Sequence, residues 1–304
     1  MKLSISSQIE ANKNKTWLIM AFFTLFIATV SYLFGQTSGY GISYAGMALI
    51  ISGLISLASF YWSDKVVLAM SRAKEADRGK DAELIAVCEN VASQAKIPIP
   101  KVYVIEEKAP NAFATGRDST HAVVCVTRGL LETLKSTELE GVIAHEISHI
   151  QNYDTRLMAI VSVLIGMVAF LSDTFMRSLW FGSVSRQSDR EEKGNLGSIL
   201  FLVGIILAII SPIIATLIQL SISRRREFLA DASSALLTHN PEGLASALEK
   251  ISKSKEILPI ASSATAHLFI VNPFAGKTLS SFASLFNTHP PVEERIKILR
   301  NMAI

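Results

Sequence analysis

His145-Glu146-Ile147-Ser148-His149 is the pentapeptide from which the interpretation of this chain starts. Residues four apart lie on one face of a helix, so the two imidazoles can converge on a single metal ion. Glu146 can reach a water molecule beside that ion without being a ligand itself. The pattern is short enough to occur by chance, and its two histidines would then be ordinary residues of an amphipathic helix. Other parts of the chain have to separate these two interpretations.

The residues around the pentapeptide favour a helix. Thr137 and Glu140 have the T-x-x-E spacing of a capping box, which predicts that the helix starts eight residues before His145. Apolar residues recur at helical spacing beside the histidines, at Leu139, Val142, Ile143 and Ile150. This stripe predicts that the helix is packed in a core.

A second motif offers a third metal ligand. A catalytic zinc ion is usually held by three protein ligands and keeps one position open. Glu227 and Asp231 are four residues apart, so on a helix their carboxylates share a face. Glu227 could bind the metal while Asp231 accepts a hydrogen bond from the other ring nitrogen of a ligand histidine. The alternative is a solvated acidic pair that balances the arginines at 224–226.

Long uncharged runs indicate a membrane protein. No charged residue occurs at 16–63 or at 194–223, and apolar runs of this length are typical of membrane spans. We expect four spanning helices, at about residues 17–34, 42–62, 157–176 and 198–221. The third is the shortest, and it could instead be a core helix or a partly inserted one.

The distribution of basic residues predicts an orientation. Lysines and arginines precede the first span, follow the second and follow the fourth: Lys2, Lys13, Lys15, Lys65, Arg72, Lys74, Arg78, Lys80, Arg224, Arg225 and Arg226. With four spans these groups lie on one side, which the positive-inside rule makes cytoplasmic. The two motifs are separated by two crossings, so they reach the same surface. Basic residues between the third and fourth spans weaken this bias.

Charge and cysteine content exclude other classes of protein. The net charge of +3 is too small to indicate a nucleic-acid partner. Cys88 and Cys125 lie in apolar stretches without metal-ligand spacing, so we expect both to be small core residues.

With these motifs, the chain resembles the HtpX-type membrane zinc proteases, which are relatives of the CAAX prenyl proteases. The resemblance covers nearly the whole chain and includes two further signatures, PNAFATG at residues 110–116 and THPPVEER at residues 288–295. It implies one zinc ion per chain, bound by His145, His149 and Glu227. It also implies that Glu146 is the catalytic base and that Asp231 supports a ligand.

The resemblance implies roles for the two further signatures as well. Asn111, Ala112, Phe113 and Ala114 would form an exposed edge strand that pairs with an extended substrate. For Asn111, ordinary turn chemistry is nearly as good an explanation. His289 would reach the site and stabilise the transition state, and its alternative is a histidine near the start of a helix.

The expected fold is an α+β integral membrane protein, mostly helical, with a small β-sheet and a zincin-like domain built on the HExxH helix. Residues 1–63 would form a transmembrane hairpin and residues 157–221 a second one. Residues 64–156 and 222–304 would form the two parts of a cytoplasmic protease domain. In the first part we expect a helix at 81–95 and strands at 101–105, 112–115 and 121–127. Prolines at 241 and at 290–291 should begin two later helices.

The implied function is zinc-dependent cleavage of peptide bonds in damaged or misfolded membrane proteins under stress. The implied location is the bacterial inner membrane, with the catalytic domain facing the cytoplasm, the lipid bilayer and protein substrates as partners and no nucleic acid. Two rival classes are a membrane scaffold with structural zinc and a metal transporter.

Overall fold

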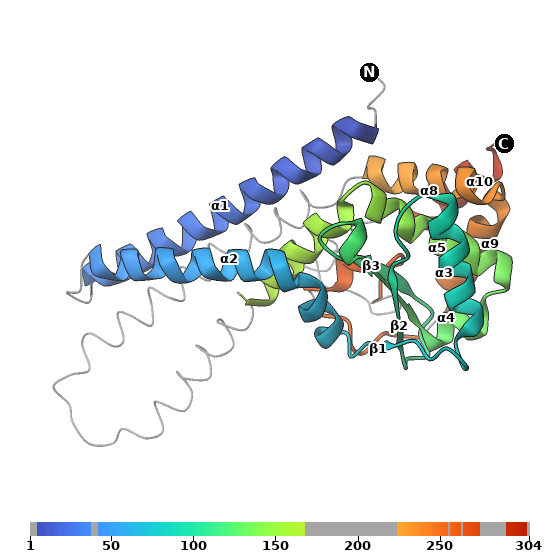
Figure 1. The fold of residues 1–304 in the computed structure, drawn as a ribbon, viewed down its shortest axis with the longest axis horizontal. Helices are drawn as coiled ribbons and strands as arrows, with labels where there is room; N and C mark the ends of the chain where they lie inside the picture. The colour runs from blue at the N-terminus through green and yellow to red at the C-terminus, as the bar shows by residue number, and fades with distance from the viewer. Residues whose placement is uncertain are drawn as a thin grey trace.

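The fold is a computed structural model that describes residues 5–37, 42–167, 224–254, 256–262, 264–273 and 290–302 (Figure 1). The labelled α-helices of the described residues are α1 (Ile5–Thr37), α2 (Ile42–Met70), α3 (Ala82–Gln94), α4 (Arg128–Thr133), α5 (Ser136–Gln151), α8 (Arg224–Thr238), α9 (Pro241–Lys253) and α10 (Val292–Arg300). The strands are β1 (Lys74–Glu75), β2 (Lys101–Ile105), β3 (Ala112–Thr115) and β4 (Val123–Thr127), and the short 3-10 helices are η1 (Ser119–His121) and η2 (Ala266–Leu268).

The four strands form one small mixed sheet in the order β1-β2-β4-β3. β2 and β4 are parallel, whereas β1 and β3 are antiparallel to their neighbours. Because β3 is last in the strand order, it is an edge strand. All five residues of β4 are buried, because both faces of the sheet are covered. Alternate residues of a strand point to opposite faces, so β4 contributes to two different cores.

One face of the sheet packs against the helices that carry the metal motifs. Val124 and Val126 belong to the same core cluster as Val142 and Ile143 of α5. The opposite face, with Cys125 and residues of β3, packs against the end of α2 and the segment around Phe269. One face of the sheet therefore supports α5, while α2 and the Phe269 segment cover the opposite face.

α1 and α2 form a long hairpin that extends away from the body containing the sheet (Figure 1). Both helices continue beyond the predicted spans, since α1 includes Lys13 and Lys15 and α2 includes Asp64 and Lys65. A further helical segment covers 154–167, and its buried side chains, among them Leu157 and Leu164, pack against α1. Among the residues that the structure describes, no helix combines the length and the apolarity that a membrane span requires.

Much of the predicted secondary structure is confirmed, including the mostly helical fold with a small sheet. The strands at 101–105 and 112–115 are observed as predicted, and the helix predicted at 81–95 is α3. The strand predicted at 121–127 is shorter, because η1 occupies residues up to His121. Asn240 caps α9, where its side chain accepts a hydrogen bond from the Gly243 N–H at 3.1 Å. The fourth predicted span and most of the second half of the third lie outside the described residues.

The predicted cap of the metal-motif helix is wrong. α5 has Lys135 as its N-cap, and the Lys135 N–H donates to the Glu138 carboxylate at 2.8 Å. The same carboxylate accepts from Lys250 of α9 at 2.6 Å. Glu138 is therefore the acid that closes the first turn, held there by a residue distant in sequence, and the predicted pairing of Thr137 with Glu140 is not formed.

Candidate metal centre

Two histidines on α5 form the centre of the site. His145 and His149 are both buried, and their Nε2 atoms are 3.1 Å apart. Their ring centroids are 4.7 Å apart, with the rings nearly perpendicular. The helix therefore places the two imidazoles side by side, as their spacing of four residues predicts.

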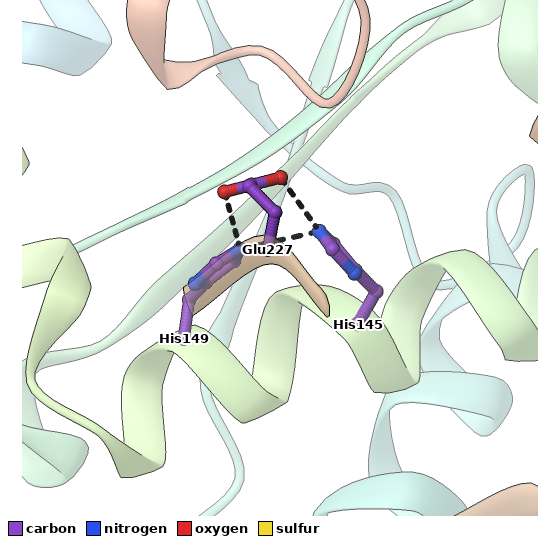
Figure 2. A group of neighbouring side chains, drawn as sticks. All are labelled: His145, His149 and Glu227. Carbon is purple, nitrogen blue, oxygen red and sulfur yellow. Dashed lines mark hydrogen bonds and ion pairs between the residues drawn. The ribbon is translucent and has the colours of Figure 1, made fainter. Parts of the chain in front are cut away.

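α8 supplies the third group. Glu227 lies in the first turn of α8 and is 3% exposed. Its Oε1 is 3.5 Å from His149 Nε2 and its Oε2 is 3.8 Å from His145 Nε2. Figure 2 shows the carboxylate facing both rings from above α5. One ligand atom from each of the three residues lies within 4.8 Å of the other two.

Close backbone packing brings α5, α8 and α9 together. A Cβ atom on Gly141 would lie 2.7 Å from the Leu244 backbone nitrogen of α9, so this position of α5 has room only for glycine. The Ser234 hydroxyl of α8 donates to the Gly141 carbonyl at 2.7 Å. These contacts hold α8 against the turn of α5 that precedes His145.

Each histidine has its own carboxylate on the ring nitrogen that faces away from the other histidine. His145 Nδ1 lies 2.9 Å from Asp231, and His149 Nδ1 lies 3.0 Å from Asp154. A proton on each Nδ1 satisfies these carboxylates and leaves each Nε2 with a free electron pair. Hydrogen bonds of this kind fix the tautomer of histidines that bind metals.

The donor set fits a catalytic zinc ion. Two imidazole nitrogens and one carboxylate are a ligand set found in zinc hydrolases, which keep a fourth position open. Within the described ranges, His145, His149 and Glu227 are the only group of such side chains whose ligand atoms converge in this way. Three buried electron-pair donors without a shared proton would repel one another unless a cation lay between them.

Without a metal, the two histidines hold protons differently. Burial lowers the pKa of His145 to about 4, and the charge of Arg295 acts in the same direction. Burial also disfavours the charged form of His149, but its bond to Asp154 and the charge of Glu227 outweigh burial and raise its pKa to about 9. The metal-free site therefore carries a proton and a positive charge on His149, and a metal ion would have to displace that proton.

Glu146 is the acid next to this centre. It is 2% exposed, and its carboxylate accepts a hydrogen bond from the Ala114 N–H of β3. Burial raises its pKa to about 7, and the charge of Glu227 also raises it, whereas His149 and the Ala114 N–H lower it. A carboxylate with a pKa near 7 can accept and release protons at neutral pH.

Arg295 is a site residue to which the sequence analysis gave no role. Its side chain is 0% exposed and donates to both oxygens of Asp231, at 2.8 and 2.7 Å. Nη1 also donates to the Ile270 carbonyl at 3.2 Å. The charge of Arg295 lowers the pKa of Asp231 to about 2 against the opposing effect of burial. The only sign of Arg295 in the sequence is its place in the THPPVEER signature. Its burial explains why it needs an acidic partner.

The predicted substrate strand is an edge strand, but it is not exposed. Asn111, Ala112, Phe113 and Ala114 are at most 3% exposed. The Ala112 carbonyl accepts a hydrogen bond from the Ile270 N–H at 2.9 Å. The prediction of an exposed edge is therefore wrong for these residues, because a segment distant in sequence lies along part of the strand.

The structure brings most of the other predicted site residues together. His145, His149, Glu227 and Asp231 lie in direct contact, with Glu146 on the same helix beside them. His289 lies outside the described residues, so its role stays a prediction.

Comparisons with known proteins identify related sequences. A family model described as peptidase family M48 matches residues 78–303. A "Protease HtpX homolog" of Caldanaerobacter subterraneus subsp. tengcongensis is 46% identical over 293 residues, with 96% of each chain covered. Proteins of the same description from Streptococcus gordonii and Pyrococcus abyssi are 40% and 44% identical, with 97% and 95% of this chain covered and 99% and 96% of theirs.

Among solved structures, the crystal structure of S. mikatae Ste24p matches with a TM-score of 0.47 and 21% sequence identity. The match covers 94% of this chain and 66% of that chain.

Proposed function

Since this chain belongs to peptidase family M48, we propose that it is a zinc-dependent endopeptidase bound to a membrane. The observation that carries this proposal is the convergence of two histidines and one glutamate beside a buried glutamate, Glu146. His145, His149 and Glu227 would hold one zinc ion per chain. The carboxylates on the far side of both rings support this assignment, since they keep each Nε2 available for a metal.

Glu146 is the proposed catalytic base. A bound zinc ion would supply a Lewis acid that polarises the scissile carbonyl and acidifies a water molecule. Glu146 accepts the proton of the attacking water and returns it to the leaving amine. Its raised pKa suits both steps near neutral pH. Asp231 and Arg295 hold His145 in position through their buried ion pair.

β3 and His289 have further proposed roles, in substrate binding and in transition-state stabilisation. Extended peptides would bind along β3, beginning at Ala114, whose N–H already faces Glu146. The Ile270 segment would have to share or vacate the edge near Ala112. His289 would stabilise the transition state, as the resemblance implies.

Exposed apolar side chains on the hairpin support membrane binding. Leu18 and Leu25 of α1 and Ile50 and Leu54 of α2 are each more than 60% exposed. A soluble surface rarely shows contiguous apolar patches of this kind. Trp17 at the base of the hairpin is 50% exposed and stacks on Phe60, and tryptophans of this type are common at the membrane–water interface.

We propose a multi-pass arrangement in a bacterial inner membrane, supported by the two uncharged runs in the sequence. The basic residues beside these runs favour a cytoplasmic catalytic domain. Substrates would be damaged or misfolded membrane proteins, cleaved in a stress response.

Cleavage of an unfolded protein by the purified full-length chain in detergent tests the proposal. Cleavage should stop when a chelator removes the metal and return when Zn²⁺ is added. Tightly bound zinc without cleavage would instead indicate a scaffold, and metal movement across vesicles without cleavage a transporter. Membrane binding is tested separately, since a protein with inserted helices stays in the membrane fraction during an alkaline carbonate wash.

A further inference from the structure

Asp154 connects the metal centre to the first helix of the hairpin. It is 1% exposed and lies five residues after His149. Its Oδ2 is 3.0 Å from His149 Nδ1, while its Oδ1 accepts hydrogen bonds from Asn12 at 2.7 Å and Arg226 at 3.0 Å. One carboxylate therefore joins α1, the end of α5 and the start of α8.

We infer that Asp154 is a positioning residue for the metal ligand His149, and that Asn12 of α1 holds Asp154 in place. The metal centre is then complete only when α1 is docked on the body of the protein. This inference rests on the proposed function for the identity of the metal.

The geometry gives Asp154 the same task at His149 that Asp231 has at His145. Each carboxylate accepts from an Nδ1 and so directs the corresponding Nε2 toward Glu227. Partners of this kind orient a ligand and raise its basicity. The two histidines are thus oriented by different parts of the chain, α8 for His145 and the turn after α5 for His149.

The backbone of that turn explains how Asp154 reaches His149. α5 ends at Gln151, and Tyr153 has a φ of 59°, in the left-handed region that non-glycine residues rarely adopt. This residue interrupts the helix, and the next helical segment begins at Asp154, whose carboxylate contacts His149 of α5. A conformation of this kind persists only when its surroundings hold it.

α1 supplies those surroundings. The Asn12 amide donates to the Asn152 carbonyl at 2.8 Å as well as to Asp154. The Lys13 ammonium lies over the Tyr153 ring, 4.5 Å from its centroid. Two consecutive residues of α1 therefore contact all three residues of the turn.

Asn12 is a buried polar residue whose side chain needs hydrogen-bond partners. It is 2% exposed, and its side-chain oxygen lies 3.3 Å from Arg226. Burying an amide is costly unless its hydrogen bonds are formed, and here its partners are the supports of the metal ligands. Arg226 itself precedes the ligand Glu227, so the same network touches two of the three proposed ligands.

Two substitutions in the full-length chain test the inference. The Asp154 carboxylate accepts three hydrogen bonds, whereas the amide in Asp154→Asn has one accepting oxygen and one donating NH₂ group. The NH₂ group must then face either His149 or the pair of Arg226 and Asn12, all of which are donors. Asn12→Ala keeps the contacts of Asp154 with His149 and Arg226, and it removes the hydrogen bonds that Asn12 forms with Asp154, Arg226 and the Asn152 carbonyl. Affinity for Zn²⁺ and Co²⁺ is measured by competition with a chelator, together with the visible absorption spectrum of bound Co²⁺.

Two matched controls separate positioning from general loss of stability. Asp81→Asn changes another buried aspartate that is paired with an arginine, Arg128, at 2.6 Å. Thr16→Val changes another buried polar side chain of α1, whose hydroxyl donates to the Asn12 carbonyl of its own helix. Both controls should keep the metal affinity of the unmodified chain.

We expect Asp154→Asn to lower metal affinity by about 10- to 100-fold and to shift the Co²⁺ spectrum. Asn12→Ala should lower affinity by about three- to tenfold. If Asp154→Asn behaves as Asp81→Asn does, the positioning role is wrong, and if Asn12→Ala behaves as Thr16→Val does, the link to α1 is wrong. Should Asp154→Asn fail to fold, the comparison of Asn12→Ala with Thr16→Val decides. An unmodified chain that binds neither metal would overturn the proposed function itself, whereas normal binding with unaffected variants overturns only this inference.

Discussion

Arg295 donates two hydrogen bonds to Asp231, at 2.8 and 2.7 Å, and neither side chain is more than 1% exposed. The pair joins α10 to α8, directly behind His145. Arg295 balances the charge of a buried aspartate, whose other partner is the His145 ring. A residue near the end of the chain therefore supports a ligand that lies in its middle.

Replacing Arg295 with methionine should lower the free energy of unfolding by about 3–5 kcal/mol, because the buried Asp231 carboxylate loses its charged partner and keeps the His145 Nδ1–H. Denaturant titration of the metal-free protein measures the change. Arg300→Met is the control, since Arg300 forms solvent-exposed ion pairs with Glu242 and Glu249. Equal destabilisation by the two substitutions would show that burial of the Arg295 pair has no special weight.

Glu146→Gln should abolish cleavage while zinc stays bound at one ion per chain. The amide keeps the size of the side chain but cannot accept a proton, and loss of a general base slows a reaction by about 10²- to 10⁴-fold. Metal analysis and cleavage of an unfolded protein are measured on the same preparation. Glu140→Gln, on the same helix but outside the site, should behave like the unmodified chain. A Glu146→Gln variant with normal activity would remove this residue from the mechanism.

Local patterns predicted the parts of this protein that depend on neighbouring residues. The HExxH spacing predicted that His145 and His149 share a helix face, and the Asn240-Pro241 pair predicted the start of α9. The motifs also predicted the resemblance to HtpX-type proteases, which the relatives confirm. The two structural predictions need only the repeat of a helix and the conformational limits of proline, and the resemblance needs only short motifs.

Contacts between distant segments were not predictable in the same way. The sequence does not single out Asp154, because nothing in its own neighbourhood distinguishes it from a surface aspartate and its partners Asn12 and Arg226 come from other helices. The edge near Ala112 was expected to be exposed because the Ile270 segment that covers it has no recognisable pattern. Such pairings are set by the packing of the whole chain.

Metal affinity should rise with pH between about pH 6 and 8. In the metal-free protein the pKa of His149 is raised to about 9, so this ring carries a proton at neutral pH that it must lose to bind a metal. Each released proton makes the apparent affinity roughly tenfold higher per pH unit, until the pH exceeds the pKa. Glu146, with a pKa of about 7, adds a second proton in the lower half of this range. Chelator competition at several pH values measures the slope, which Glu146→Gln should reduce, and an affinity independent of pH would contradict these protonation states.

Gly141→Ala should destabilise the protein and loosen the metal centre together. The added Cβ would lie 2.7 Å from the Leu244 nitrogen and 2.9 Å from its Cα, and backbone atoms cannot move aside as a flexible side chain can. α9 must then shift away from α5, at a cost of about 1–3 kcal/mol in the free energy of unfolding. Gly53→Ala is the matched control, because a Cβ there meets nothing within 4 Å and alanine favours the helix. Because the Gly141 carbonyl also holds Ser234 of α8, displacement of α5 should reach Glu227 and lower the zinc content measured after dialysis. Normal zinc content in a clearly destabilised Gly141→Ala variant would mean that α8 keeps its place without this contact.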